Sequence, residues 1–266
     1  MIEQEFQENE VTTEAMQPPS HEEQKVRDAV RELRVPILKM LEPIMENIKD
    51  GDYQLLIGDD ASGRVPTLIV RKVINDIYVK KGISSIPTRF IAGTRFFEKG
   101  KSDSDKKMAD VSAYIKELLA SIPNLKNALI VTDTIYSGKS LTPVAHSLRE
   151  SGISFDIVTV GTTYDFHESQ PEIEENLGGP IFTGMNYTPA IYSKHNIAGV
   201  YKHPEDLHSF PATSVENLHM TTDSIQNIIS IARDEANQVA KDILNDIELG
   251  KEGSSLRNET FVDEKQ

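Results

Sequence analysis

The sequence contains no cysteine among its 266 residues, and it contains no apolar run long enough to cross a membrane. The lack of cysteine excludes a disulfide scaffold, a cysteine-ligated zinc site, an iron–sulfur cluster and a cysteine nucleophile. A membrane span needs about 20 apolar residues. The first residues, MIEQEFQENEV, have neither the basic nor the apolar part of a secretion signal. We therefore expect a soluble, cytoplasmic protein that has no membrane partner.

Basic residues are scarce: 28 Lys and Arg stand against 42 Asp and Glu, which gives a net charge of −14. Nucleic acids and anionic membranes bind cationic surfaces that release counterions, so we expect neither as a partner. Half of the net charge comes from residues 1–24, which hold seven acids and no Lys or Arg. This segment is polar, lacks an amphipathic period and contains Pro18-Pro19. We predict that it is a disordered acidic tail.

Short apolar segments alternate with helical patterns over most of the chain. Apolar residues at steps of three or four predict helices over 23–48 (interrupted at Pro36 and Pro43), 64–79, 108–119, 141–150 and 223–248. Mostly apolar segments of about four to six residues predict strands at 53–57, 87–92, 128–131 and 155–160. This alternation is typical of an α/β fold with a doubly wound, mostly parallel sheet and helices on both faces.

Two stretches lack such a pattern. Residues 94–107 have no apolar residue after Phe97, which predicts a mobile loop. Residues 164–215 are irregular, with short strands expected at 180–183 and 197–201. We expect a small C-terminal hood and helical region there. The predicted units are the tail 1–24, a domain 25–249 (core 53–163; hood and C-terminal helix 164–249) and a polar tail 250–266.

The stretch 128–141, ALIVTDTIYSGKSL, carries the strongest chemical signal. An apolar strand leads into Thr132-Asp133, and the segment 136–140 then opens a helix. Hydroxyls, a glycine and free amides at a helix N-terminus form a cradle for phosphate, and the helix dipole favours its negative charge. The ATP-binding P-loop also ends in Gly-Lys-Ser, but it needs a glycine five positions before Gly138, where this chain has Asp133. The spacing therefore excludes a P-loop.

A second polar loop follows the first predicted strand, at 57–67, with the sequence IGDDASGRVPT. In open parallel sheets, ligands bind at the carboxyl ends of the strands, where loops lead into helix N-termini. Both loops are therefore candidate parts of a ligand site.

Together the two loops resemble the substrate site of the type I phosphoribosyltransferases, which use 5-phosphoribosyl 1-pyrophosphate (PRPP). The stretch 128–141 is similar in order and spacing to the PRPP-binding signature of that family, and the loop at 57–67 is similar to its pyrophosphate loop. The polar segment 94–109 falls where the family keeps a flexible loop that closes over the reacting bond. The resemblance covers residues 53–163.

The resemblance implies a role for each matching residue. The ribose hydroxyls would be bound by Thr132 and Asp133. The 5′-phosphate would be bound by Tyr136, Ser137, Gly138, Lys139 and Ser140. The pyrophosphate would be bound by Ala61, Ser62, Gly63 and Arg64. Catalysis would depend on Asp133, which orients the ribose, and on Arg64, which neutralises the leaving group. Mg²⁺ would arrive with the pyrophosphate, so no metal site is assigned to the protein alone.

Two positions depart from the family pattern. The first acid of the ribose-binding pair is Thr132, which brings a hydroxyl and no charge. The later acid of the phosphate loop is Tyr136, and a phenol is a poor base at neutral pH.

Three functions remain open. The first is transfer of the phosphoribosyl group to an unidentified small-molecule acceptor with release of pyrophosphate. The alternative is a weak or inactive protein that binds PRPP or a ribose phosphate as a regulator. The third is another nucleotide-handling α/β protein that shares only the phosphate loop. A homodimer is also open, because dimers are usual in the resembled family.

Overall fold

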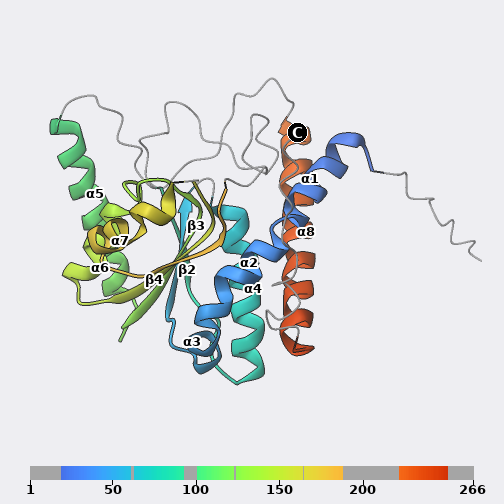
Figure 1. The fold of residues 1–266 in the computed structure, drawn as a ribbon, viewed down its shortest axis with the longest axis horizontal. Helices are drawn as coiled ribbons and strands as arrows, with labels where there is room; N and C mark the ends of the chain where they lie inside the picture. The colour runs from blue at the N-terminus through green and yellow to red at the C-terminus, as the bar shows by residue number, and fades with distance from the viewer. Residues whose placement is uncertain are drawn as a thin grey trace, which may run out of the picture.

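The structure, a computed structural model, describes residues 19–60, 63–92, 101–122, 124–163, 165–187 and 222–250. Its centre is a sheet of five parallel strands in the order β2-β1-β3-β4-β5 (Figure 1). The strands are β1 (Leu55–Asp60), β2 (Thr88–Ala92), β3 (Asn127–Ile135), β4 (Ser154–Thr162) and β5 (Ile181–Met185). The helices are α1 (His21–Arg31), α2 (Arg34–Leu41), η1 (Glu42–Ile44), α3 (Met45–Asp50), α4 (Arg64–Lys80), α5 (Lys101–Ala120), α6 (Thr142–Glu150), α7 (Phe166–Leu177) and α8 (Thr222–Glu248).

Helices cover both faces of the sheet. Successive side chains of a strand point to opposite faces, so each strand contributes residues to two buried clusters. Leu56 and Leu129 lie in a buried cluster with residues of α1, α2, α3, α4 and α8. Leu55 and Ile130 lie in a second buried cluster with residues of α5, α6 and α7. Figure 1 shows these layers on either side of the sheet. The predicted doubly wound α/β fold is confirmed.

The N-terminal helices follow from local signals. The Ser20 hydroxyl accepts from the Glu23 N–H at 3.3 Å, and the Glu23 carboxylate accepts from the Ser20 N–H at 2.8 Å, so α1 begins with a capping box. Residues 21–24 therefore belong to α1, so the predicted disordered tail 1–24 extends too far along the chain. Residues 1–18 lie outside the described residues. Pro36 lies in the first turn of α2 and Pro43 in η1, which confirms the predicted interruptions.

Two helices extend into regions where the sequence predicts loop or irregular structure. α5 begins at Lys101, so residues 101–107 are helical and not part of a loop. These residues are all polar, so they show no apolar period although a helix tolerates them. α7 was not predicted. It buries only Phe166, Ile173 and Leu177 and contains Pro171, so its sequence pattern is weak.

The C-terminal part of the chain completes the α/β layers. β5 confirms the strand predicted at 180–183 and is the edge strand of the sheet, paired with β4, although it fell in the predicted hood. The strand predicted at 197–201 lies outside the described residues. α8 confirms the helix predicted at 223–248 and packs against α1 and α4. In the described residues, no helix has both the length and the apolar character that a bilayer crossing requires.

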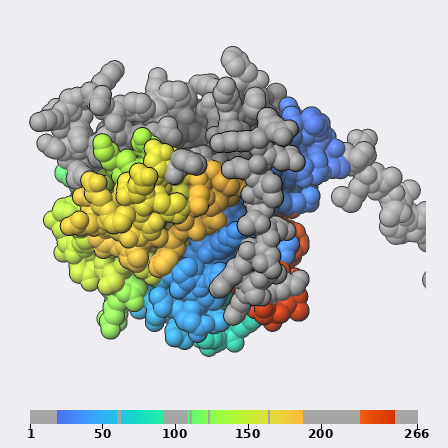
Figure 2. Space-filling model, viewed as in Figure 1, coloured from blue at the N-terminus to red at the C-terminus, as the bar shows by residue number. Residues whose placement is uncertain are grey.

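α2 packs on β5 with the two backbones in direct contact. A Cβ atom added at Gly184 would lie 2.2 Å from the carbonyl oxygen of Pro36 and 2.6 Å from its carbonyl carbon. In the space-filling view, blue N-terminal residues lie directly beside the orange residues of the β5 region (Figure 2). Only glycine leaves room for this contact, which attaches the N-terminal helices to the edge of the sheet.

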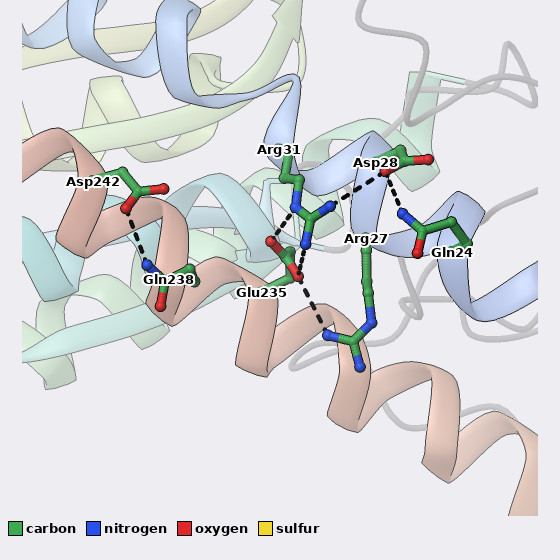
Figure 3. A network of polar contacts seen from close by, with 7 residues as sticks. All are labelled: Gln24, Arg27, Asp28, Arg31, Glu235, Gln238 and Asp242. Carbon is green, nitrogen blue, oxygen red and sulfur yellow. Dashed lines mark hydrogen bonds and ion pairs between the residues drawn. The ribbon is translucent and has the colours of Figure 1, made fainter. Parts of the chain in front are cut away.

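Charged side chains join α1 to α8, from opposite ends of the chain (Figure 3). The Glu235 carboxylate of α8 is only 4% exposed and accepts from Arg31 Nε at 2.6 Å, Arg31 Nη2 at 3.3 Å and Arg27 Nη1 at 3.3 Å. Arg34 of α2 donates to Asp246, in the last turn of α8, at 2.6 Å and 3.0 Å. These pairs orient the first helices along the last one.

A buried tyrosine makes the stability of the fold sensitive to alkaline pH. The Tyr78 hydroxyl donates to the Tyr53 carbonyl at 2.9 Å, and burial raises the pKa of Tyr78 from 10.0 to about 12. Between these values the unfolded chain loses the phenolic proton and the native chain keeps it, so stability falls as pH rises. We expect a loss of about 1 kcal/mol from this group between pH 8 and pH 11, measured by urea unfolding. Tyr78→Phe should show a smaller loss over the same interval; an equal loss would contradict the prediction.

Candidate functional site

The candidate site lies where the winding of the sheet reverses. β1 is flanked by β2 and β3, and α4 covers one face of the sheet whereas α5 covers the other. In doubly wound sheets with this strand order, ligands bind at the carboxyl ends of the two strands at that reversal. Here these ends are Asp59-Asp60 of β1 and the segment 132–135 of β3.

Thr132 and Asp133 are part of a strand and not of a loop. β3 extends from Asn127 to Ile135, four residues beyond the end predicted from the apolar run. Thr132, Thr134 and Ile135 are β-branched, a residue type that suits strands, and Thr132 pairs with Thr159 of β4. Thr132 is 1% exposed and Asp133 is 8% exposed, so the rigid sheet holds both side chains.

The Thr132 hydroxyl lies between two carboxylates. Its Oγ1 atom is 3.1 Å from Oδ2 of Asp59, on the neighbouring strand, and 3.3 Å from Oδ1 of Asp133. A hydroxyl has one hydrogen and can donate it to only one of them at a time. No role was predicted for Asp59 from the sequence. Its spacing from Leu55 and Ile57 places it on the same face of β1, which is the signal that could have identified it.

The predicted phosphate loop connects β3 to α6. Tyr136, Ser137 and Lys139 are exposed, with 71% of Tyr136 accessible. Among the described residues, the backbone N–H groups of residues 137–140 have no hydrogen-bond acceptor. α6 starts at Thr142, so these amides lie at its N-terminus, where the helix dipole favours an anion.

Gly138 sets the shape of this loop. Its φ of +69° is a conformation that residues with a side chain rarely adopt. A Cβ atom at this position would lie 2.9 Å from Ile173 Cγ2 of α7. Its carbonyl accepts from the Leu141 N–H at 2.9 Å, closing the turn that leads into α6. The conformation of the loop therefore requires a glycine at position 138, independently of its predicted role in binding the 5′-phosphate.

The loop after β1 is described only in part. Ala61 and Ser62 lie outside the described residues. The Gly63 N–H donates to the Asp59 carbonyl at 2.9 Å, so in this structure that amide is already engaged within the protein. A Cβ at Gly63 would lie 2.5 Å from the same carbonyl oxygen, so Gly63 lets α4 start directly against β1. Arg64, the first residue of α4, places its guanidinium carbon 5.4 Å from the ring centre of Phe90 in β2.

The structure thus brings Thr132, Asp133 and the segment 136–140 to one edge of the sheet, with Gly63 and Arg64 on the adjacent strand end. It also reveals one polar atom that the sequence did not predict. Among the described residues, the buried Thr134 hydroxyl has no hydrogen-bond partner. No group of three or more His, Asp or Glu side chains arranged to hold a metal occurs within the described residues.

Comparison with known proteins finds similarity among solved structures but no family match. No protein-family model matches the chain, and no curated protein matches it. Among solved structures it is similar to a purine phosphoribosyltransferase from Pyrococcus horikoshii Ot3, at 18% identity and a TM-score of 0.30, over 53% of this chain and 74% of that one. At this TM-score the similarity carries no argument about substrate or mechanism.

Proposed function

We propose that this protein binds PRPP with Mg²⁺ and transfers its phosphoribosyl group to a small-molecule acceptor, releasing pyrophosphate. The observation that carries the proposal is the row of backbone N–H groups at 137–140, which lies at a helix N-terminus directly after Asp133. An anion bound by these amides would place an attached sugar beside the strand ends. The exposed Lys139 adds a positive charge to a chain whose net charge is −14.

The chemistry needs little covalent help from the protein. The acceptor attacks the anomeric carbon of the ribose, the bond from that carbon to the pyrophosphate oxygen breaks, and its electron pair leaves with the pyrophosphate. Asp133 orients the ribose, the segment 136–140 fixes the 5′-phosphate, and Arg64 lies at the next strand end to neutralise the leaving group. Mg²⁺, held chiefly by the substrate's phosphates, supplies further charge neutralisation, and the carboxylates at this edge are oxygen donors that suit it.

Binding without transfer is the second candidate function. Thr132 and Tyr136 occupy positions where the resembled family has acids. Tyr136 is 71% exposed and offers a phenol instead of a carboxylate. A protein with this site could bind PRPP or a ribose phosphate and act as a regulator. A homodimer rests on the resemblance alone, and the resemblance assigns no particular acceptor.

Isothermal titration with PRPP and Mg²⁺ tests the binding step. We expect Asp133→Asn to weaken binding at least tenfold, at a cost of about 1.4 kcal/mol or more, because it removes a charged acceptor of the ribose hydroxyls. Asp52→Asn is the matched control, since Asp52 is exposed and precedes β1 at the opposite edge of the sheet. PRPP should also protect the chain from unfolding better than ATP or NAD does.

The outcomes separate the candidate functions. Binding together with pyrophosphate release on screening acceptors supports the transferase, and binding without release supports the regulator. If the parent chain binds no PRPP, or if ATP or NAD protects it better, both PRPP-based functions fail.

A further inference from the structure

We propose that the groove between α4 and α8 is a second anion site of this protein, and that it binds a phosphate group through Arg71 and Arg233. This groove is separate from the candidate site, because its lining includes neither the strand ends nor the loops at 57–67 and 136–140. The inference goes beyond the proposed function and does not depend on it.

The groove is formed by two helices that pack against each other (Figure 1). Both helices contribute the same pair of side chains to its lining, an arginine followed one turn later by an asparagine. These are Arg71 and Asn75 on α4, and Arg233 and Asn237 on α8. Residues four positions apart lie on the same face of a helix. Each helix therefore presents one guanidinium group and one amide to the groove.

The groove is cationic in a chain whose net charge is −14. Its lining holds three basic side chains, those of Arg71, Lys72 and Arg233, and a single carboxylate. That carboxylate belongs to Asp76, and it accepts from Lys72 Nζ at 2.9 Å. Neither arginine makes a hydrogen bond or an ion pair with any of the described residues. Two guanidinium groups of the groove are therefore left without a counter-charge in the described part of the chain.

The opposite side of α8 differs in this respect. Glu235 lies two positions after Arg233 and pairs with arginines of α1. Residues two positions apart do not share a helix face, so α8 directs paired charges toward α1 and an arginine without a partner toward α4. Like charges that face one another repel. A bound anion would remove this repulsion and supply the missing counter-charge.

Asn75 is held in the orientation that suits an anion. Its Oδ1 atom accepts from the Ile86 N–H at 2.8 Å. A backbone N–H only donates, so this bond identifies the amide oxygen and leaves the Nδ2 group, which is a donor, for the groove. Guanidinium groups bind phosphate oxygens in pairs through their planar fork of N–H donors. Arg71, Asn75 and Arg233 therefore offer donors from both helices to the oxygens of one phosphate group.

The size of the groove admits more than a free ion. Its volume is about 450 Å³, which falls within the range of about 300–1,000 Å³ that is usual for small-molecule pockets. Leu68 and Val79 add apolar surface to the lining, and Val79 is 63% exposed. The phosphate group is thus supplied either as inorganic phosphate or as the phosphate monoester of a small molecule.

The test is an NMR titration of the full chain with inorganic phosphate at constant ionic strength, observing the arginine Nε–H groups. The spectra of Arg71→Gln and Arg233→Gln identify the two resonances of the groove, because each variant lacks one of them. We expect both resonances to shift and to give the same dissociation constant. Arg149, assigned in the same way, is the control. It is also exposed but lies on α6, in the other helical layer, so its resonance should stay in place.

Substitutions measure the contribution of each guanidinium group. In Arg71→Gln the Arg233 resonance still reports binding, and its dissociation constant should rise at least tenfold. Arg71→Lys keeps the charge but not the planar fork, so the rise should be smaller. Arg149→Gln is the matched control, which removes the same charge elsewhere and should change nothing. Lys139→Gln, in the predicted phosphate loop, should also leave the titration of the groove as it is in the parent.

The outcomes decide the proposal and its ligand. Phenyl phosphate that binds more tightly than inorganic phosphate identifies a monoester as the ligand, and equal or weaker binding identifies the free ion. The proposal is overturned if neither groove resonance shifts, if the Arg149 resonance shifts as much, or if Arg71→Gln leaves the Arg233 titration unchanged. A lower urea midpoint for Arg71→Gln than for the parent would make Arg71 structural and also overturn its assignment. A failure of PRPP binding would leave all these results unaffected.

Discussion

Replacing Gly184 with alanine should lower the free energy of unfolding by about 3 kcal/mol or more. The added Cβ would lie 2.2 Å from the Pro36 carbonyl oxygen and 2.7 Å from its Cα, and both are backbone atoms that no side-chain rotation can move away. Overpacking in a buried contact costs about 1–3 kcal/mol when side chains can adjust. In Gly184→Ala, α2 must move away from β5, so we expect a loss of stability at the upper end of that range or above it.

Gly82→Ala is the control for this prediction. Gly82 has a positive φ of +72°, and its added Cβ would meet nothing within 4 Å. Only the conformational cost of the left-handed backbone applies there, about 1–2 kcal/mol. Urea unfolding of the two variants should give clearly different losses. Equal losses would show that α2 and β5 do not make the close backbone contact described here.

Replacing Glu235 with alanine should cost about 2–3 kcal/mol and release α1 from α8. This carboxylate is 4% exposed and accepts three hydrogen bonds from Arg27 and Arg31 (Figure 3). Hydrogen bonds to charged groups contribute about 1.5–3 kcal/mol each at most, and pairs with a partly exposed partner contribute less. The arginines are 33% and 54% exposed and can return to water, so the loss stays below that of a fully buried pair.

Asp234→Ala provides the matched comparison for Glu235→Ala. Asp234 is adjacent in the sequence, carries the same charge and is exposed, so its loss should change stability by less than about 0.5 kcal/mol. Hydrogen exchange should show faster exchange of the α1 amides in Glu235→Ala alone. Similar stability and exchange in the two variants would mean that the network does not hold α1 in place.

Much of the fold could be predicted from the sequence because its signals are local. Residues 128–131 are apolar at every position and residues 155–160 are mostly apolar, which marks strands buried on both faces. The steps of three or four in α4 and α8 mark helices with one buried face. The turn at Gly138 and the polar residues around it likewise identify the start of α6, which is the position of the predicted phosphate loop.

The sequence was less informative where polar residues form regular structure. Thr132 and Asp133 ended the apolar run, yet the ladder with β4 continues through them, because strand pairing is made by backbone groups that do not depend on apolar side chains. α7 has few buried residues and an internal proline, so its apolar pattern is weak. In the folded chain its buried residues share one cluster with residues of α6 and β5.

The sequence by itself determined the class of fold and the position of a loop suited to phosphate. Only the tertiary structure decided which polar groups share that loop's edge of the sheet. Asp59 meets Thr132 because β1 and β3 are neighbours, and Glu235 meets Arg31 because the first and last helices pack together. These partners are separated by dozens to hundreds of residues. Periodicity reports which face of an element is buried and says nothing of the strand order that brings such distant residues into contact.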